Sequence, residues 1–188
     1  MFPDADRWVL TAEPDAPVTA GVDLHAVRVG VVTARQELYR RFAPVVHGIA
    51  LSIVGPTDAD DVTQDVFLKV FHRIADLRDP GAIGAWLCGI ARNVARDFLR
   101  RRRRRQAAPL DHEPQAAERG DGELAERVLA LVRTLPDAYR ETLVLRLVEG
   151  LSGPEIAERT GLTHGSIRVN LHRGMEMLRP LLHKEGWA

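Results

Sequence analysis

The chain has 188 residues, of which 45% are hydrophobic and 28% charged, and its 26 basic and 26 acidic residues leave no net charge. This composition is typical of a soluble globular protein with one ordinary domain or two small ones. The sequence contains neither an apolar run long enough to span a membrane nor a secretory signal pattern in residues 1–30, so we expect a cytoplasmic protein without membrane insertion. The single cysteine, Cys88, excludes an internal disulfide and a multi-cysteine zinc site.

The charge is arranged in blocks along the chain. Residues 1–30 hold two basic against five acidic residues, residues 100–105 are six consecutive arginines, and residues 106–123 hold one basic against five acidic residues. A concentrated basic block beside acidic segments predicts local binding of an anion rather than a general attraction to nucleic acid. Part of the block has a simpler explanation, because cations at a helix end favour the helix dipole and keep a protein in solution.

Helical periodicity dominates, and no segment alternates as a strand does, so the sequence predicts an all-α fold. Residues 1–22 form an N-terminal extension of unknown role. From Thr33, which has capping-box spacing to Gln36, apolar residues recur every three or four positions to Ile53, and Pro44 marks a kink or a restart. A second helix follows in residues 58–76. A third carries an apolar face that runs into the arginines; its predicted buried residues are Ile83, Trp86, Leu87, Ile90, Ala91, Val94 and Phe98.

Residues 106–122 are rich in Ala, Pro, Gly and acids, the composition of a flexible linker. We therefore expect one small helical domain over residues 23–105 and another over 123–188. In the second, a short helix near Pro154 to Thr160 ends at Gly161, and Thr163 starts a longer one, as in a helix-turn-helix. Its expected corner residues are Ile156, Ala157, Leu162, Ile167 and Leu171. A pair of antiparallel helices in an ordinary bundle fits the same pattern.

Three stretches together resemble bacterial sigma factors of the extracytoplasmic-function group. They are "DADDVTQDVFLKVF", "AWLCGIARNVARDFLRRRRR" and "LPDAYRETLVLRLVEGLSGPEIAERTGLTHGSIRVNLHRGMEML". The first two are similar to region 2 of that family, a helical bundle, and the third to region 4, which contains a helix-turn-helix. The resemblance covers roughly residues 34–182. It implies an alternative sigma factor that joins core RNA polymerase at its clamp helices and flap and directs it to promoter DNA.

The resemblance also implies roles for individual residues. Asp61, Gln64 and Asp65 match positions that engage the clamp helices. The alternatives are acids that favour the start of a helix, and metal-binding carboxylates extending from Asp58 to Asp65, as in a metal-dependent enzyme. No second carboxylate cluster accompanies them in the sequence, so we expect no metal site, no cofactor and no catalytic residues.

For the minus-ten element, we expect contacts from one helix and the loop before it. Arg92, Asn93 and Arg96 fall on its non-core side, where they can bond to bases or phosphates. Trp86 matches a family tryptophan, although a core aromatic fits its spacing equally well. Because six arginines cannot share one helix face, only part of the block can meet phosphates at once, and we assign Arg100, Arg103 and Arg104 to the DNA backbone.

For the minus-thirty-five element, the second helix of the helix-turn-helix carries the candidates. They are Thr163, Ser166, Arg168, Asn170 and Arg173. Asn170 stands where the family often has arginine, and asparagine favours adenine over the guanine that arginine reads. A stand-alone helix-turn-helix regulator is the alternative function, and relatives of this group are commonly held inactive by an anti-sigma protein.

Overall fold

The computed structural model describes residues 22–106 and 122–187, and all regular elements in these two segments are helices. The predicted all-α fold of two small domains is confirmed. The N-terminal domain contains α1 (Leu24–Arg28), α2 (Val32–Val54), α3 (Pro56–Arg73) and α4 (Ile83–Gln106), and the C-terminal domain contains α5 (Gly122–Arg133), α6 (Asp137–Leu147), α7 (Gly153–Thr160) and α8 (His164–Lys184). Residues 1–21 of the proposed extension (1–22) and residues 107–121 of the proposed linker (106–122) lie outside the described residues. No helix in the described part is long and apolar enough to cross a membrane.

Helix α2 is the central element of the N-terminal domain, and its start differs from the prediction. The N-cap is Val31, whose side chain makes no capping bond, so Thr33 already lies inside the first turn and its hydroxyl cannot cap the helix with Gln36. The helix also continues through Pro44. Its apolar face, which includes the fully buried Leu38 and Phe42, packs against α3 and α4, and this packing outweighs the loss of one backbone hydrogen bond.

Helix α4 largely follows its predicted pattern. Ile83, Leu87, Ile90, Ala91 and Val94 are buried, as expected. Trp86 and Phe98 lie on the same side of the helix and pack against the core, but they are only partly buried. The six arginines continue the same helix, which ends at Gln106. Their side chains are therefore distributed around a helix and cannot all face one partner.

Helices α7 and α8 have the expected helix-turn-helix termini. Ser152 and Glu155 form a capping box at the start of α7, Gly161 closes that helix with a φ of 74°, and the Thr163 side chain accepts a hydrogen bond from the Ser166 backbone. A left-handed residue at this turn favours glycine. Four of the predicted corner residues are buried or partly buried, but Leu162 is 39% exposed, so its assignment to the corner is wrong.

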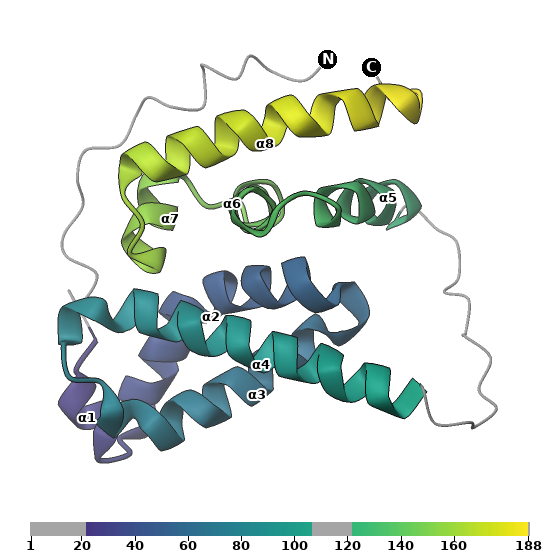
Figure 1. The fold of residues 1–188 in the computed structure, drawn as a ribbon. Coiled ribbons are helices and arrows are strands. Elements are labelled where there is room, and N and C mark those ends of the chain that lie inside the picture. The colour runs from purple at the N-terminus through teal and green to yellow at the C-terminus, as the bar shows by residue number, and fades with distance from the viewer. Residues whose placement is uncertain (1–21, 107–121, 188) are drawn as a thin grey trace.

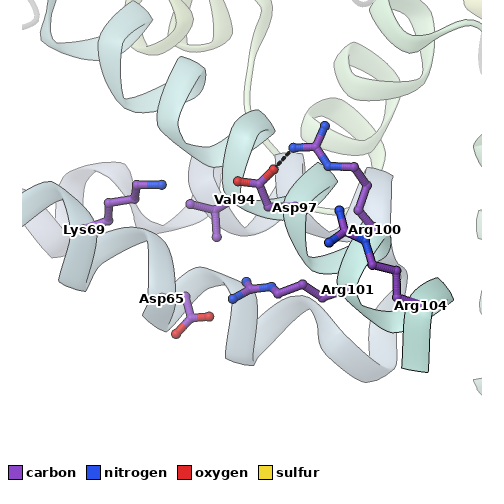
Figure 2. Close-up of a pocket in the computed structure, with 7 residues that line it drawn as sticks. All are labelled: Asp65, Lys69, Val94, Asp97, Arg100, Arg101 and Arg104. Atoms are coloured by element: carbon purple, nitrogen blue, oxygen red, sulfur yellow. Dashed lines mark hydrogen bonds and ion pairs between the residues drawn. The ribbon is translucent and has the colours of Figure 1, made fainter. Parts of the chain in front are cut away.

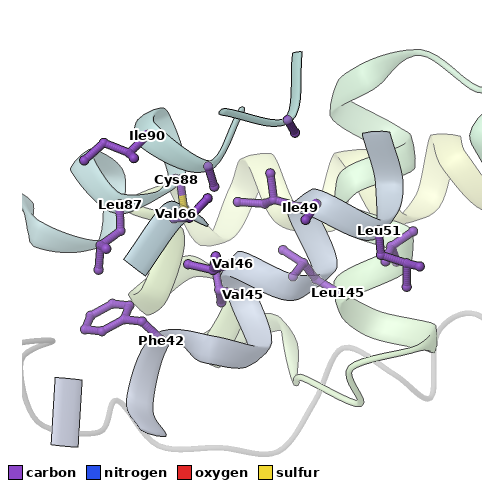
Figure 3. Close-up of a cluster of buried hydrophobic side chains, with 14 of the residues drawn as sticks. Phe42, Val45, Val46, Ile49, Leu51, Val66, Leu87, Cys88, Ile90 and Leu145 are labelled. Carbon is purple, nitrogen blue, oxygen red and sulfur yellow. The ribbon is translucent and has the colours of Figure 1, made fainter. Parts of the chain in front are cut away.

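The two domains pack directly on each other, which the sequence did not predict. Helix α6 lies against α2, and α7 lies against α4, so the C-terminal domain forms a layer over the N-terminal one (Figure 1). Leu145 of α6 joins the cluster formed by Ile49 and Leu51 of α2 (Figure 3). A Cβ on Gly48 of α2 would lie only 2.6 Å from the Leu145 side chain, so this glycine permits the close approach of α6.

Candidate nucleic-acid interface

The predicted polymerase-binding residues lie on the outer face of α3. Val62 and Val66 point into the core, and this fixes Asp61, Gln64 and Asp65 on the exposed side of the same turns. The other two acids of this helix are engaged within the protein, because Asp58 pairs with Arg102 and Asp60 lies 3.5 Å from His47. In the described segments, no group of three or more His, Cys, Asp or Glu side chains is placed to hold a metal ion.

A basic groove runs between α3 and the end of α4. Its lining residues are Asp65, Lys69, Val94, Asp97, Arg100, Arg101 and Arg104 (Figure 2). The structure thus brings two predicted DNA-binding arginines, Arg100 and Arg104, beside the predicted polymerase-binding Asp65. Arg100 pairs with Asp97, and Arg101, which the sequence reasoning did not single out, extends along the groove toward Asp65 (Figure 2).

Two other arginines of the block lie on another side of α4. Arg102 and Arg103 border a depression at the junction of α2 and α3, together with Arg133 of α5. Arg102 bonds to Asp58 and so ties the end of α4 to the start of α3. Burial lowers the pKa of Arg133, and repulsion from Arg140 and Arg102 lowers this pKa further. The arginine block therefore divides into a part along α3 and a part near the C-terminal domain.

The predicted minus-ten residues on α4 do not form one common surface. Arg92 donates two hydrogen bonds to Glu141 of α6, of 2.8 and 2.6 Å, and Arg96 donates one of 3.1 Å to Asp137 of the same helix. The hydrogen bond to Glu141 raises the pKa of Arg92, against the opposing effect of burial. Asn93 is exposed on another side, and Trp86 is partly buried against the core.

The predicted minus-thirty-five residues lie on the first turns of α8. Ser166, Arg168 and Arg173 are exposed, and so is Thr163, whose hydroxyl caps the helix and lies 2.8 Å from the Ser166 hydroxyl. Asn170 is half-buried, and its amide donates to the Thr142 hydroxyl of α6 at 3.4 Å.

Two further side chains share the exposed face of α8. Val169 is 43% exposed, and His172 is exposed beside Glu176 at 3.5 Å. The signal that would have found them is helical spacing, since His172 follows Arg168 by four positions and Val169 precedes Arg173 by four.

Comparison with known families gives a match for each of the two domains. The model of Sigma-70 region 2 matches residues 38–105, and the model of Sigma-70, region 4, matches residues 125–178. The extracytoplasmic-function sigma factor SigE of Mycolicibacterium smegmatis is 34% identical over an alignment that covers 98% of this chain and 74% of the relative. The sigma factor CarQ of Myxococcus xanthus is 35% identical and covers 82% of this chain and 92% of its own.

Solved structures give a similar result. The structure of CnrH in complex with the cytosolic domain of CnrY matches 86% of this chain and 95% of its own, with a TM-score of 0.57 and 31% identity. A second, the sigma factor RpoE in complex with the anti-sigma factor NepR from Bartonella quintana, has a TM-score of 0.53 at 24% identity, covers 81% of this chain and supports the fold alone.

Proposed function

Because the chain belongs to the extracytoplasmic-function group of RNA polymerase sigma factors and is an alternative sigma factor of transcription initiation, we propose how its residues divide that work. The observation that supports the division is the match of region 2 and region 4 in order, over separate helical domains. In this proposal the N-terminal domain binds core RNA polymerase and the minus-ten element, and the C-terminal domain binds the minus-thirty-five element. The protein contributes promoter specificity and requires no cofactor or catalytic residue of its own.

Core polymerase binds the acidic face of α3 through Asp61, Gln64 and Asp65. Three features support this assignment: the side chains are exposed, they lie within two helical turns, and the opposite face of the helix is anchored in the core. Carboxylates in such a position attract a basic partner surface and orient it before close contact. Contacts with the polymerase clamp helices use this face, and contacts with the flap use the C-terminal domain.

Minus-ten DNA binds along α4. Arg100, Arg103 and Arg104 neutralise phosphates, which gives affinity without sequence information. Arg92, Asn93 and Arg96 lie closer to the start of the helix and bond to base edges or phosphates of the separated strand. Trp86, with its ring partly exposed, offers a surface on which an unpaired base stacks.

Minus-thirty-five DNA receives the first turns of α8 in its major groove. Arg168 and Arg173 are exposed there and have the donors that read guanine or bind phosphate. Thr163 and Ser166, at the N-terminus of this helix, lie where a phosphate is favoured. Asn170 reads its base only after releasing the Thr142 hydroxyl, so its contribution to specificity is smaller than that of Arg168.

A protein partner that holds this chain inactive is part of the same proposal. CnrH, 31% identical to this chain, has been solved with the cytosolic domain of CnrY. We expect an anti-sigma factor to bind this chain in the cytoplasm, where core polymerase is found. Its identity would follow from affinity capture with the full chain.

Transcription with purified components tests the proposed function. The protein, core RNA polymerase and fragments of the source genome should give discrete new transcripts, and the double variant Asp61→Ala/Asp65→Ala should reduce them strongly. Asp76→Ala, which removes an exposed acid paired only locally with Arg73, is the control for loss of negative charge. Tight binding of duplex DNA by the protein alone, without new start sites, would instead identify a stand-alone helix-turn-helix regulator.

A further inference from the structure

Four acid–base contacts join the two domains, and in all four the base belongs to the N-terminal domain and the acid to the C-terminal domain. The pairs among the described residues are Arg41 with Glu158 at 2.7 Å, His47 with Glu149 at 2.6 Å, Arg92 with Glu141 at 2.6 Å and Arg96 with Asp137 at 3.1 Å. At these four contacts the C-terminal domain presents carboxylates to basic side chains, whereas its Arg133 meets a backbone carbonyl of the N-terminal domain.

Two of these pairs use residues that we assign to promoter DNA. Arg92 and Arg96 are one helical turn apart on α4, and their partners Glu141 and Asp137 are one turn apart on α6. The two carboxylates therefore repeat at the spacing of the two guanidinium groups. Carboxylates and phosphates accept the same paired hydrogen bonds from arginine. The carboxylates of α6 therefore bind the two guanidinium groups in the way that DNA phosphates would.

Close backbone contact accompanies the charges. A Cβ on Gly84 of α4 would lie 2.4 Å from the carbonyl oxygen of Arg159 in α7, and one on Gly161 would lie 3.1 Å from the Cβ of Ala85. Arg133 of α5 also donates to the Ile53 carbonyl near the end of α2, at 3.2 Å. Because glycines allow the two domains to approach to backbone distance, their surfaces are complementary in shape as well as in charge.

The domain contact engages two of the proposed minus-ten residues and leaves most of the other proposed functional residues exposed. Asp61, Gln64 and Asp65 remain exposed on α3, and Arg168 and Arg173 remain exposed on α8. By contrast, the side chain of Glu141 is 12% exposed and that of Arg92 30% exposed in their pair. The arrangement thus leaves Asp61, Gln64, Asp65, Arg168 and Arg173 open while it engages two of the proposed minus-ten residues, Arg92 and Arg96.

We propose that the C-terminal domain is an internal competitor of minus-ten DNA, and that the structure is a closed, self-inhibited state of the free protein. This inference rests on the proposed function, because it requires Arg92 and Arg96 to be DNA-binding residues. DNA then binds only the fraction of molecules in which the domains have separated, and its apparent affinity falls in proportion to that fraction. Core polymerase activates the protein by binding the open state better than the closed one.

Charge reversal at a pair that contains no proposed DNA contact, Arg41 with Glu158, tests the closed state. Arg41→Glu should separate the domains, because it places two carboxylates together at Glu158. Arg40→Glu is the matched control, since the neighbouring Arg40 is exposed and pairs with Glu37 of its own helix. The double variant Arg41→Glu/Glu158→Arg restores an opposite pair across the interface.

Two measurements on the free full-length protein follow from this design. Small-angle X-ray scattering should give a larger radius of gyration for Arg41→Glu than for the wild type and Arg40→Glu. A short random-sequence single-stranded DNA should bind Arg41→Glu at least about fivefold more tightly than the wild type. This factor is expected if the free-energy difference between the closed and open states changes by the energy of one ion pair. This gain opposes simple electrostatics, because the variant is more acidic than the wild type. The double variant should return both values toward those of the wild type.

Several results would overturn the inference. It fails if the wild type is already as extended as Arg41→Glu, or if Arg41→Glu and Arg40→Glu behave alike. Glu158→Arg, a change in the other domain, must also expand the protein, and this guards against misfolding of a single variant. If Arg41→Glu expands but binds single-stranded DNA no more tightly, the domains do contact each other in the free protein, but the contact does not compete with DNA. Wild-type transcription with core polymerase tests the proposed function separately, and it would persist in each of these cases.

Discussion

Gly84→Ala is the substitution for which the structure predicts the clearest effect on the domain contact. The added methyl carbon would lie 2.4 Å from the carbonyl oxygen of Arg159 and 2.9 Å from its carbonyl carbon. Carbon and oxygen atoms in close contact lie about 3.3 Å apart or more, so α4 and α7 must separate by roughly 1 Å. Neither atom belongs to a flexible side chain that could turn away.

The size of the effect follows from the kind of strain. Inserting a methyl group into a packed contact destabilises it by about 1–3 kcal/mol. A backbone shift of roughly 1 Å also removes a quarter to a half of the dispersion energy of the atoms that separate. We therefore expect the closed state to become roughly fivefold to a hundredfold less populated relative to the open one.

Gly89→Ala is the control, because it makes the same chemical change on the same helix. A Cβ at Gly89 meets no atom within 4 Å. It should stabilise the N-terminal domain by up to about 1 kcal/mol through helix propensity and leave the domain contact unchanged. Scattering of the free proteins should show expansion for Gly84→Ala alone. If both variants keep the compact radius and equal affinity for single-stranded DNA, the reasoning on the α4 and α7 contact is refuted.

Three further predictions concern single side chains. The hydrogen bond to Glu149 raises the pKa of His47 more than burial lowers it. The charged histidine should therefore stabilise the closed state fully below the ordinary histidine pKa of about 6.5, and this stabilisation should be lost as the pH rises through the raised pKa. Scattering should show that the wild type opens over that pH interval and that His47→Gln does not. Burial raises the pKa of Cys88 to about 12, so a thiol reagent should label this buried cysteine slowly. Faster labelling in Gly84→Ala would show that the domains have opened, whereas equal labelling rates would argue against opening. Thr163→Ala should destabilise the C-terminal domain by about 1 kcal/mol in denaturant unfolding, while Thr163→Ser should retain the cap and the stability.

Local signals explain what the sequence predicted well. Gly161 and Thr163 act within one turn of themselves, so their roles at the end of α7 and the start of α8 were visible in the sequence. Leu162, between them, was assigned to the corner by its apolar character alone, and its exposure depends on the direction of a turn that periodicity does not give. The start of α2 was misplaced for a similar reason: Thr33 has the right spacing, but backbone hydrogen bonds already begin the helix before it.

Contacts between the domains had no local signal. Arg92 lies on the polar side of a helix, and a DNA role and an ion pair both fit that position until Glu141, 49 residues later in the chain, is placed beside it. Gly84 offered a weak hint, because a glycine inside a helix lowers its stability unless another backbone approaches. Neither residue identifies its partner in the other domain, which is why the sequence predicted two domains but not their contact.

The energetics of the interface suit a contact that must be broken. Its ion pairs are partly exposed, and pairs of this kind contribute about 1 kcal/mol or less each, so the charges select the arrangement more than they stabilise it. Shifting a two-state equilibrium from almost fully closed to almost fully open requires about 5.5 kcal/mol of differential binding. The proposal therefore requires core polymerase to supply that amount by binding the exposed face of α3 and a surface on the C-terminal domain better in the open state than in the closed one.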